Sequence, residues 1–344
     1  MIVYNLTSPI IITLPYGNYV IDDNNGNYLY QGRLDKSPLS VGNTIDFDIA
    51  PIIRQLIRPF DYSNTFVKTT YSFVDRTNEI IRKFAIEDAN GIFHYIDVVW
   101  DYSMTVYDNE PINECVNYGI QNYIYDNQLF PFNYLTDWEP IEYLYLKAKQ
   151  GNNYIGLSMF YPQSVMESIF ATTRVSKAVY SYLEDGDELA YWSSDYGIDT
   201  QKSSSYIYKE CVPTHTFTMY FVNKRGGLSW CHFDGKNIVE TNVTRNQITH
   251  QNPYTWTTKF GIDNYSISEY KTYTLNTDYL NDVQSEQVQE LVTSPFVWLQ
   301  DYDNNRIFSV VITDTTHTIK NKKNDKLFNY TIKCKESNQQ NIYA

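Results

Sequence analysis

The strongest constraint on the fold is a set of short segments in which apolar and polar residues alternate. Residues 216–221 read TFTMYF, so that Phe217, Met219 and Phe221 share one face of an extended strand. Residues 44–48 and 328–334 show the same period of two. This period is typical of a half-buried β-strand, because successive side chains of a strand point to opposite faces. The sequence therefore predicts an all-β fold built from antiparallel β-sandwich domains.

The composition favours strands over helices. The 344 residues include 33 tyrosines and 17 phenylalanines; asparagine, aspartate and threonine are also abundant, and alanine is scarce. Aromatic and β-branched residues suit a pleated, partly buried surface, while asparagine and aspartate suit turns. A single core rarely grows beyond about 250–300 residues, so this length predicts more than one domain.

Turn residues divide the chain into many short strands and a few short helices. The sequences at 22–27 and 88–91 each contain an Asn-Gly pair, which supplies the positive φ angles of tight hairpins. Pro51 and Pro59 bound a short helix at 49–59, because proline suits a first helical turn and cannot continue a helix. Further short helices are expected at 162–172 and 285–291, and an exposed loop at 193–205. The expected strands are 9–14, 18–21, 28–30, 44–48, 66–74, 80–87, 92–100, 143–148, 153–160, 206–210, 216–221, 228–233, 296–299, 307–313 and 328–334.

Four regions follow from this pattern. They are an N-terminal β-sandwich (1–105), an aromatic-rich connector (106–142), a middle β region (143–214) and a C-terminal β-sandwich (215–344). A flexible linker would be polar or rich in glycine and serine, so the aromatic connector is expected to pack against another surface. Aromatic residues are enriched at protein interfaces, and the connector is therefore the predicted contact between subunits. The candidate interface residues are Tyr118, Tyr123, Tyr125, Phe130, Phe132, Tyr134 and Trp138.

Charge and cysteine spacing argue against several classes of protein. The net charge of −13 argues against sequence-specific nucleic-acid binding, because such proteins present a basic face to phosphates. The four cysteines are widely spaced, so we expect no zinc site, no disulfide framework and no cofactor. The N-terminal residues lack the features of a signal peptide, and no apolar stretch is long enough to cross a membrane. We interpret the lysines near the C-terminus as protection of an edge strand: Lys320, Lys322, Lys323 and Lys326.

No pattern of residues predicts catalysis. The five histidines lie outside the motifs of nucleophilic triads and zinc hydrolases, and no phosphate-binding glycine loop is present. Acidic residues at 184, 185, 187 and 188 flank Trp192, which leaves a glycosidase pair as an alternative to a solvated acidic turn. The Asp/Asn-rich segments 22–27 and 301–305 carry oxygen ligands of the kind that calcium prefers, although hairpin turns are the default interpretation.

Segments in the last third of the chain resemble a recurring pattern of phage virion proteins. They are MYFVNKRGGLSWCHFDGK (219–236), ELVTSPFVWL (290–299) and IFSVVITD with NDKLFNYTIKCKES (307–337). The pattern places an FxNxxGG hairpin before a short helix, a VxITD strand and a final NYTI strand. It is similar to tail and tail-associated proteins of the crAss-like bacteriophages, which infect Bacteroides-like hosts. The resemblance covers residues 215–337, with further support from DFDIAPIIRQLI at 46–57. It implies a β-sandwich-rich tail component and supplies no catalytic residues.

These observations predict a non-enzymatic structural subunit of a phage tail, such as a ring, collar or hub-associated component. The expected partners are copies of the chain in a ring and other tail or portal-proximal proteins. The expected location is the virion, after synthesis in the host cytoplasm. A carbohydrate-binding adhesin stays open as an alternative, and a glycan hydrolase is ranked last. The tryptophans considered for sugar binding are Trp192, Trp230, Trp256 and Trp298.

Overall fold

The structure is a computed structural model in which the chain divides into two compact units. Unit 1 comprises Met1–Cys211 and Val222–Ser229, and unit 2 comprises Val212–Phe221 and Trp230–Ala344. The chain therefore leaves unit 1, returns to it for one short segment, and leaves it again. The residues that the structure describes are 3–5, 9–24, 26–36, 42–57, 62–63, 66, 72–75, 81–99, 113–136, 143–160, 168–195, 198–249, 262–313, 329–337 and 340–343.

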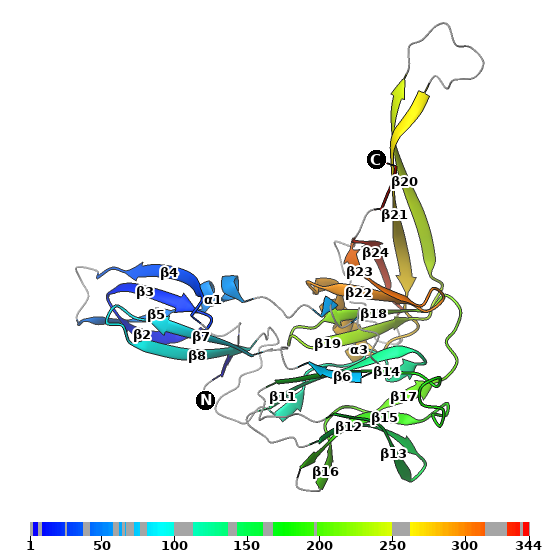
Figure 1. The fold of residues 1–344 in the computed structure, drawn as a ribbon, viewed down its shortest axis with the longest axis horizontal. Helices are drawn as coiled ribbons and strands as arrows, with labels where there is room; N and C mark the ends of the chain where they lie inside the picture. Colours follow the sequence, from blue (N-terminus) through cyan, green and yellow to red (C-terminus); the bar gives the residue numbers. More distant parts are fainter. Residues whose placement is uncertain are drawn as a thin grey trace. The chain divides into compact units, whose positions relative to one another are not determined.

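The N-terminal part of unit 1 is a small sandwich. Its elements are β1 (Val3–Asn5), β2 (Ile11–Pro15), β3 (Gly17–Asp22), β4 (Tyr28–Leu34), β5 (Thr44–Asp48), α1 (Ala50–Leu56), β7 (Ile81–Glu87) and β8 (Phe93–Val99). A five-stranded sheet in the order β1-β8-β7-β3-β4 packs against the β2-β5 pair and α1 (Figure 1). The neighbours pair antiparallel except β1 and β8, which run parallel.

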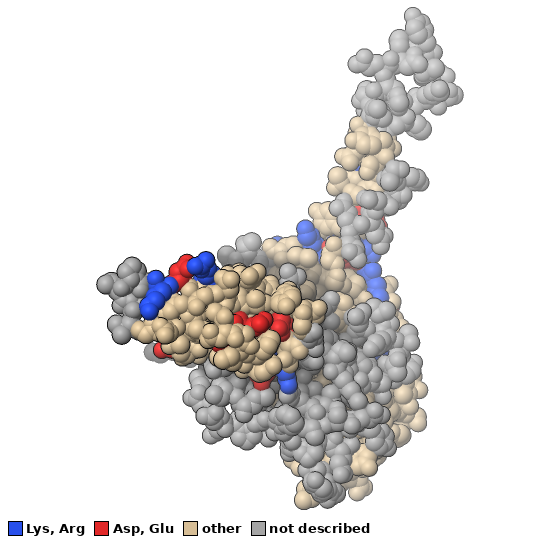
Figure 2. Space-filling view, turned by 60° about the vertical axis from the view of Figure 1, so that its left-hand side comes forward, with Lys and Arg blue, Asp and Glu red and all other residues tan. Residues whose placement is uncertain are grey.

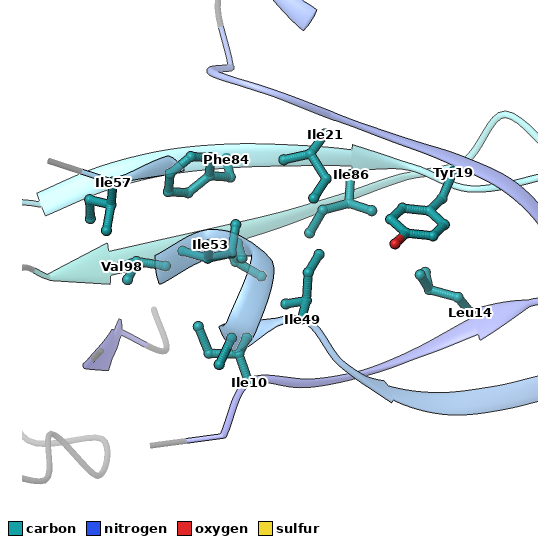
Figure 3. Packing of buried hydrophobic residues seen from close by; sticks show 12 residues of the cluster. Ile10, Leu14, Tyr19, Ile21, Ile49, Ile53, Ile57, Phe84, Ile86 and Val98 are labelled. Carbon is teal, nitrogen blue, oxygen red and sulfur yellow. The ribbon is translucent and has the colours of Figure 1, made fainter. Parts of the chain in front are cut away.

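Alternating apolar residues form the core of this sandwich. Tyr19 and Ile21 of β3 and Ile86 of β7 project into one cluster, which Ile53 of α1 enters from the other side (Figure 3). The expected helix is confirmed, with Pro51 in its first turn. The expected hairpin turns also form, and Asn24, Gly26 and Gly91 have the positive φ angles that such turns require.

The rest of unit 1 contains a second sandwich. A four-stranded sheet in the order β6-β14-β11-β9 consists of β6 (Ser72–Asp75), β14 (Ser168–Val175), β11 (Gln128–Thr136) and β9 (Asn113–Cys115). A six-stranded sheet in the order β10-β17-β15-β12-β13, with β16 also paired to β15, consists of β10 (Tyr123–Tyr125), β17 (Tyr206–Lys209), β15 (Glu188–Asp195), β12 (Tyr143–Gln150), β13 (Asn153–Phe160) and β16 (Ile198–Gln201). The two sheets meet at Tyr191, whose ring lies 4.9 Å from that of Phe130 and 4.7 Å from that of Phe132.

Three predictions for this region are wrong. The expected connector contributes β9, β10 and β11 to the second sandwich. Residues 168–172 of the expected helix belong to β14, which pairs with β11 at eight positions, and residues 161–167 lie outside the described part. Within the expected loop 193–205, β15 ends and β16 forms. The expected helix is wrong because β14 is buried on both faces at 169–173, so its sequence has no alternation to distinguish it from a helix.

A buried polar network fixes the turn Val222–Ser229 within unit 1. Asn133 Nδ2 donates to the Tyr62 hydroxyl at 3.0 Å, and that hydroxyl donates to the Gly226 carbonyl at 2.7 Å. Asn133 Oδ1 accepts from the Leu228 N–H at 2.9 Å. Asn223 Nδ2 donates to a carbonyl in the segment after β9 at 2.7 Å. The asparagines and Tyr62 are buried, so each of these bonds satisfies a group that water does not reach.

Unit 2 is built on one eight-stranded sheet. Its elements are β18 (Phe217–Val222), β19 (Leu228–Phe233), β20 (Ile238–Thr249), β21 (Ile262–Asn276), α3 (Asp282–Thr293), β22 (Val297–Asp301), β23 (Arg306–Ile312), β24 (Thr331–Glu336) and β25 (Gln340–Tyr343). The strand order is β19-β18-β22-β23-β24-β21-β20, and β25 also pairs with β21. Helix α3 starts with a capping box in which Asn281 and Gln284 exchange side-chain and backbone hydrogen bonds.

The expected multidomain all-β class is confirmed. In β24, Ile332 and Cys334 are buried between exposed neighbours, as the alternation predicts. The strands at 216–221 and 228–233 also form, but every residue of β18 and β19 is buried, so these strands are not half-buried as expected. In the part of the chain that the structure describes, no helix combines the length and the apolar character needed to span a membrane.

Candidate assembly and binding surfaces

Most of the predicted interface residues belong to the core of the second sandwich. Tyr125, Phe130, Phe132 and Tyr134 are at most 2% exposed. β11 lies between β14 and β9, and Phe132 stacks on Tyr134 with ring centroids 5.7 Å apart. These side chains have no surface left for a second subunit, so their assignment to an interface is corrected.

The other predicted interface residues have different surroundings. Tyr118 and Tyr123 are partly buried, and Lys209 Nζ lies 3.5 Å from the centroid of the Tyr123 ring. Trp138 lies outside the described residues. Contact of these three residues with another subunit stays a prediction.

The most extended element of unit 2 is an antiparallel ribbon of β20 and β21, here called the arm. β20 has 12 residues and β21 has 15, and they pair from Ile238 with Thr274 to Thr249 with Ile262. Figure 1 shows the ribbon continuing beyond the other strands of its sheet. β24 and β25 pair with β21 only between Ile267 and Asn276. Among the described strands, the arm is therefore two-stranded beyond that point.

Both faces of β20 are exposed, whereas β21 is partly buried and its Tyr273 belongs to the core. Ile238 and Val239 are successive residues and therefore point to opposite faces, yet they are 45% and 47% exposed. Val243 is 45% exposed and Tyr265 is 61% exposed. A two-stranded ribbon without a covered face is marginally stable by itself in water. The arm is thus a surface that a partner would stabilise.

The outer edge of the arm is open among the described strands. β20 pairs only with β21, so one row of its backbone N–H and C=O groups is available for another strand. β20 contains no proline, and its charged residues are Glu240 and Arg245. One bulge, at Asn246 and Gln247, interrupts its register. Natural sheet edges are usually protected by lysines, prolines or short length, and this edge has little of that protection.

Our sequence interpretation missed the arm for a physical reason. Strand prediction relied on an apolar face, and residues 266–274 instead place Ile267, Glu269, Lys271 and Tyr273 on the same face. That mixture arises because only one end of the face is packed into a core: Tyr273 is 1% exposed, whereas Ile267, Glu269 and Lys271 are only partly buried. The remaining signal was the β-propensity of threonine, valine, isoleucine and tyrosine in both strands.

The tryptophans considered for sugar binding differ in burial. Trp230 and Trp298 are 0% and 4% exposed, so they belong to the core. Trp256 lies outside the described residues, and Trp192 is partly exposed on the outward face of the six-stranded sheet. Among the tryptophans that the structure describes, Trp192 is thus the candidate whose side chain can contact a sugar.

The acidic cluster beside Trp192 is largely engaged in turn structure. Asp187 is 6% exposed and accepts hydrogen bonds from the Glu184 N–H at 2.9 Å and from Gln150 Nε2 at 2.8 Å. Asp185 accepts from a backbone N–H, and Glu188 pairs with a lysine. These contacts favour the acidic turn over a glycosidase pair, which requires two carboxyl groups facing each other across a sugar.

The carboxylates of the Asp/Asn-rich loops accept hydrogen bonds from within their own turns. Asp22 Oδ1 accepts from the Asn24 N–H at 2.7 Å, and Asp23 accepts from the backbone and side chain of Asn27. Asp301 accepts from the backbone and side chain of Asn304. No group of three or more His, Cys, Asp or Glu side chains with the geometry of a metal site occurs within the described ranges.

An open pocket of about 400 Å³ lies where the arm begins, beside Ile238 of β20 and Asn276 of β21. Gly235 donates its N–H to the Asn276 carbonyl at 2.9 Å along one wall. The pocket lining contains neither histidine nor cysteine, so it gives no support to a catalytic reading. The lining residues are Gly235, Lys236, Ile238, Asn276, Thr277, Asp278, Tyr279 and Asn329.

Charged side chains are dispersed among the described residues on one face of the molecule. On the face drawn in Figure 2, described lysine, arginine and acidic side chains form small groups of both signs within a mostly uncharged surface. The four C-terminal lysines interpreted as edge protection lie outside the described residues.

No protein-family model matches the sequence, and no curated protein matches it. Function must therefore be inferred from the surfaces described above.

Proposed function

We propose that this chain is a non-enzymatic structural subunit that assembles with copies of itself and with other proteins. The observation that carries the proposal is the arm, whose two faces and outer edge are open along most of β20. Addition of a strand at such an edge supplies backbone hydrogen bonds for affinity, and the alternating side chains supply specificity. In a subunit that functions alone, Ile238, Val239 and Val243 of β20 would stay exposed to water.

The contact would join unlike surfaces of neighbouring subunits. When the arm of one copy binds a different surface of the next, the contact is head-to-tail, and such contacts generate rings where the rotation closes. The segments that resemble tail proteins of crAss-like bacteriophages lie before and after the two strands of the arm in the sequence, and this resemblance supports a place in a phage tail. The location that follows is the virion, after synthesis in the host cytoplasm.

Self-assembly is tested first on the purified full chain by light scattering after size-exclusion chromatography. We expect an oligomer at micromolar concentration. In one variant, residues 247–265 are replaced by Asn-Gly, so that Asn246 and Ser266, which pair in the arm, flank a two-residue hairpin turn. In a second variant, Val239→Lys and Val243→Lys add charges to one face of β20. Both variants should lose assembly and keep their far-ultraviolet circular dichroism.

A control places one such charge elsewhere in unit 2. Val283 on α3 is 66% exposed, and Val283→Lys should leave assembly unchanged. A full chain that stays monomeric at all concentrations, or arm variants that assemble like the parent, would contradict a role of the arm in self-assembly.

The place in a virion has its own test. Quantitative peptide mass spectrometry of gradient-purified particles should find the chain at a fixed ratio to the portal protein. Presence in infected cells without presence in particles would reject the virion role, whatever the oligomeric state of the purified chain.

A further inference from the structure

The outward face of the six-stranded sheet in unit 1 is an aromatic surface, separate from the arm. Strand register places Tyr145 of β12 between Trp192 of β15 and Met159 of β13. The same register places Lys147 between Ala190 and Gly156, and Lys149 between Glu188 and Tyr154. Alternate residues of β12, beginning with Leu144, are buried on the opposite side. The aromatic face is defined by Tyr143, Tyr145, Lys147, Tyr154, Met159 and Trp192.

The rings of the aromatic face form a cluster around one lysine. Tyr154 meets Trp192 edge-on, with ring centroids 5.1 Å apart. Lys147 Nζ lies 5.2 Å from the Tyr145 centroid and 5.3 Å from the Trp192 centroid. The same ammonium donates to Asp199 Oδ2 at 2.5 Å, and this hydrogen bond holds the pKa of Asp199 below its ordinary value. The lysine is thus fixed in position among the rings.

The face is also accessible. Tyr154 is 51% exposed and Met159 is 45% exposed. A Cβ atom added to Gly156, beside Lys147, would meet no atom within 4 Å, so the space over this part of β13 is open. The aromatic face therefore offers ring surfaces to a ligand and, at Gly156, space above the backbone; the Gly156 carbonyl itself accepts from the Tyr182 hydroxyl at 3.1 Å.

The charges on the face select the kind of ligand. Lys147 pairs with Asp199, and Lys149 pairs with Glu188 at 3.3 Å, so the positive and negative charges balance. A basic surface would favour an anionic ligand, whereas a balanced one favours a neutral ligand that both donates and accepts hydrogen bonds. The tyrosines, Trp192 and Met159 are of types that are enriched at protein interfaces. The buried core of an interface is nevertheless depleted in lysine, aspartate and glutamate, and here these residues lie among the rings. This chemistry fits a protein partner poorly.

We propose that the aromatic face binds a neutral glycan. The C–H face of a pyranose ring is apolar and packs on aromatic rings, while its equatorial hydroxyls reach charged and polar side chains at the ring edge. Trp192 and Tyr154 supply the ring contacts, and Lys147 and Asp199 supply a donor and an acceptor beside them. The face is the outer surface of a sheet, so it suits a segment within a chain of sugars. This binding role is additional to assembly through the arm and does not depend on it.

The test uses the purified full chain on a printed array of neutral and acidic oligosaccharides, followed by calorimetric titration with the strongest neutral binder. Trp192→Ala removes the central ring, and Gly156→Gln fills the space above the backbone without loss of any ring. Gly156 has no positive φ, so a side chain there introduces no backbone strain. Both variants should bind at least tenfold more weakly and retain the parent melting temperature.

A matched control removes an exposed aromatic residue elsewhere. Tyr95 on β8 is 69% exposed, and Tyr95→Ala should leave glycan affinity unchanged. The proposal is overturned if the full chain binds no neutral glycan, if it prefers acidic glycans, or if both variants bind like the parent. It is also overturned if Trp192→Ala changes the oligomeric state while glycan binding persists, because the face would then be a contact between copies.

Discussion

Replacing Asn223 by alanine should destabilise unit 1 strongly, because this side chain satisfies several buried groups. Asn223 is 2% exposed. Its Nδ2 donates to the Val116 carbonyl at 2.7 Å and to Ser229 Oγ at 2.8 Å. Its Oδ1 accepts from the N–H groups of Arg225 at 2.9 Å and Gly227 at 3.0 Å. Alanine at this position would break all four hydrogen bonds.

The size of the loss follows from what each partner can do afterwards. Arg225 is partly exposed, so water can replace its bond, and Ser229 Oγ still accepts from the Tyr118 N–H at 3.1 Å. The Val116 carbonyl and the Gly227 N–H are buried and lose a partner. Each such group costs about 1–3 kcal/mol, so we expect the free energy of unfolding to fall by about 2–6 kcal/mol.

The assay must separate the two units, because a chain with two compact units need not unfold in one step. Hydrogen exchange followed by mass spectrometry in increasing urea reports the opening free energy of each peptide. The peptides from 113–136 should lose protection at lower urea in Asn223→Ala than in the parent.

The matched control is Asn237→Ala in unit 2. The Asn237 side chain makes three hydrogen bonds, to the His215 and Phe233 carbonyls and from the Asn276 N–H. Asn237 is only partly buried, so water can replace these bonds. The free energy of unfolding should therefore fall by about 1 kcal/mol or less per bond. Equal and small effects of both substitutions would refute the reasoning that burial makes the Asn223 bonds decisive.

Three further results are expected. Burial raises the pKa of Asp88, but hydrogen bonds from backbone N–H groups and from His94 lower this pKa more, so that it lies below its ordinary value. The Asp88 carboxylate therefore stabilises the N-terminal sandwich at pH values above the ordinary pKa, and this stabilisation is lost as pH falls through the lowered pKa. Asp88→Asn should therefore flatten the acid side of a stability profile measured between pH 7 and 2, and an unchanged profile would count against it. Burial raises the pKa of Tyr191 far above its ordinary value, so the contribution of its neutral hydroxyl to stability is present below pH ~10 and is lost at higher pH. Tyr191→Phe should therefore remove one tyrosine from the late, cooperative stage of a tyrosinate absorbance titration. Burial raises the pKa of the Cys115 thiol to about 12, whereas Cys211 is exposed. A thiol reagent at pH 8 should therefore label one cysteine rapidly, and Cys211→Ser should abolish that labelling. Rapid labelling of two cysteines would contradict this prediction.

Local features of this chain could be predicted because their causes are local. The Asp/Asn-Gly turns fix positive φ angles at the turn residues themselves, as at Gly26 and Gly91. Pro51 favours a helix start wherever the rest of the chain lies. β24 alternates because one of its faces is buried and the other is exposed.

The aromatic segment 113–136 shows where such reasoning fails. Phe130 and Phe132 need to be removed from water, and the sequence predicts that much. The same composition serves an interface with another subunit and a core within the chain, so composition cannot say which. Pairing of β11 with β14, about forty residues along the chain, decided for the core.

The candidate surfaces were decided by tertiary structure for the same reason. Tyrosine and threonine content predicted strands, yet the openness of the arm depends on where the pairing of β24 and β25 with β21 ends. The aromatic face exists because the register of β12 with β15 places Tyr145 beside Trp192. A shift of one residue would send one of these rings into the core, and only the packing of both sheets against each other fixes that register. The sequence by itself determined a strand-dense, tyrosine-rich, acidic chain, and long-range pairing determined which of its aromatic residues meet solvent.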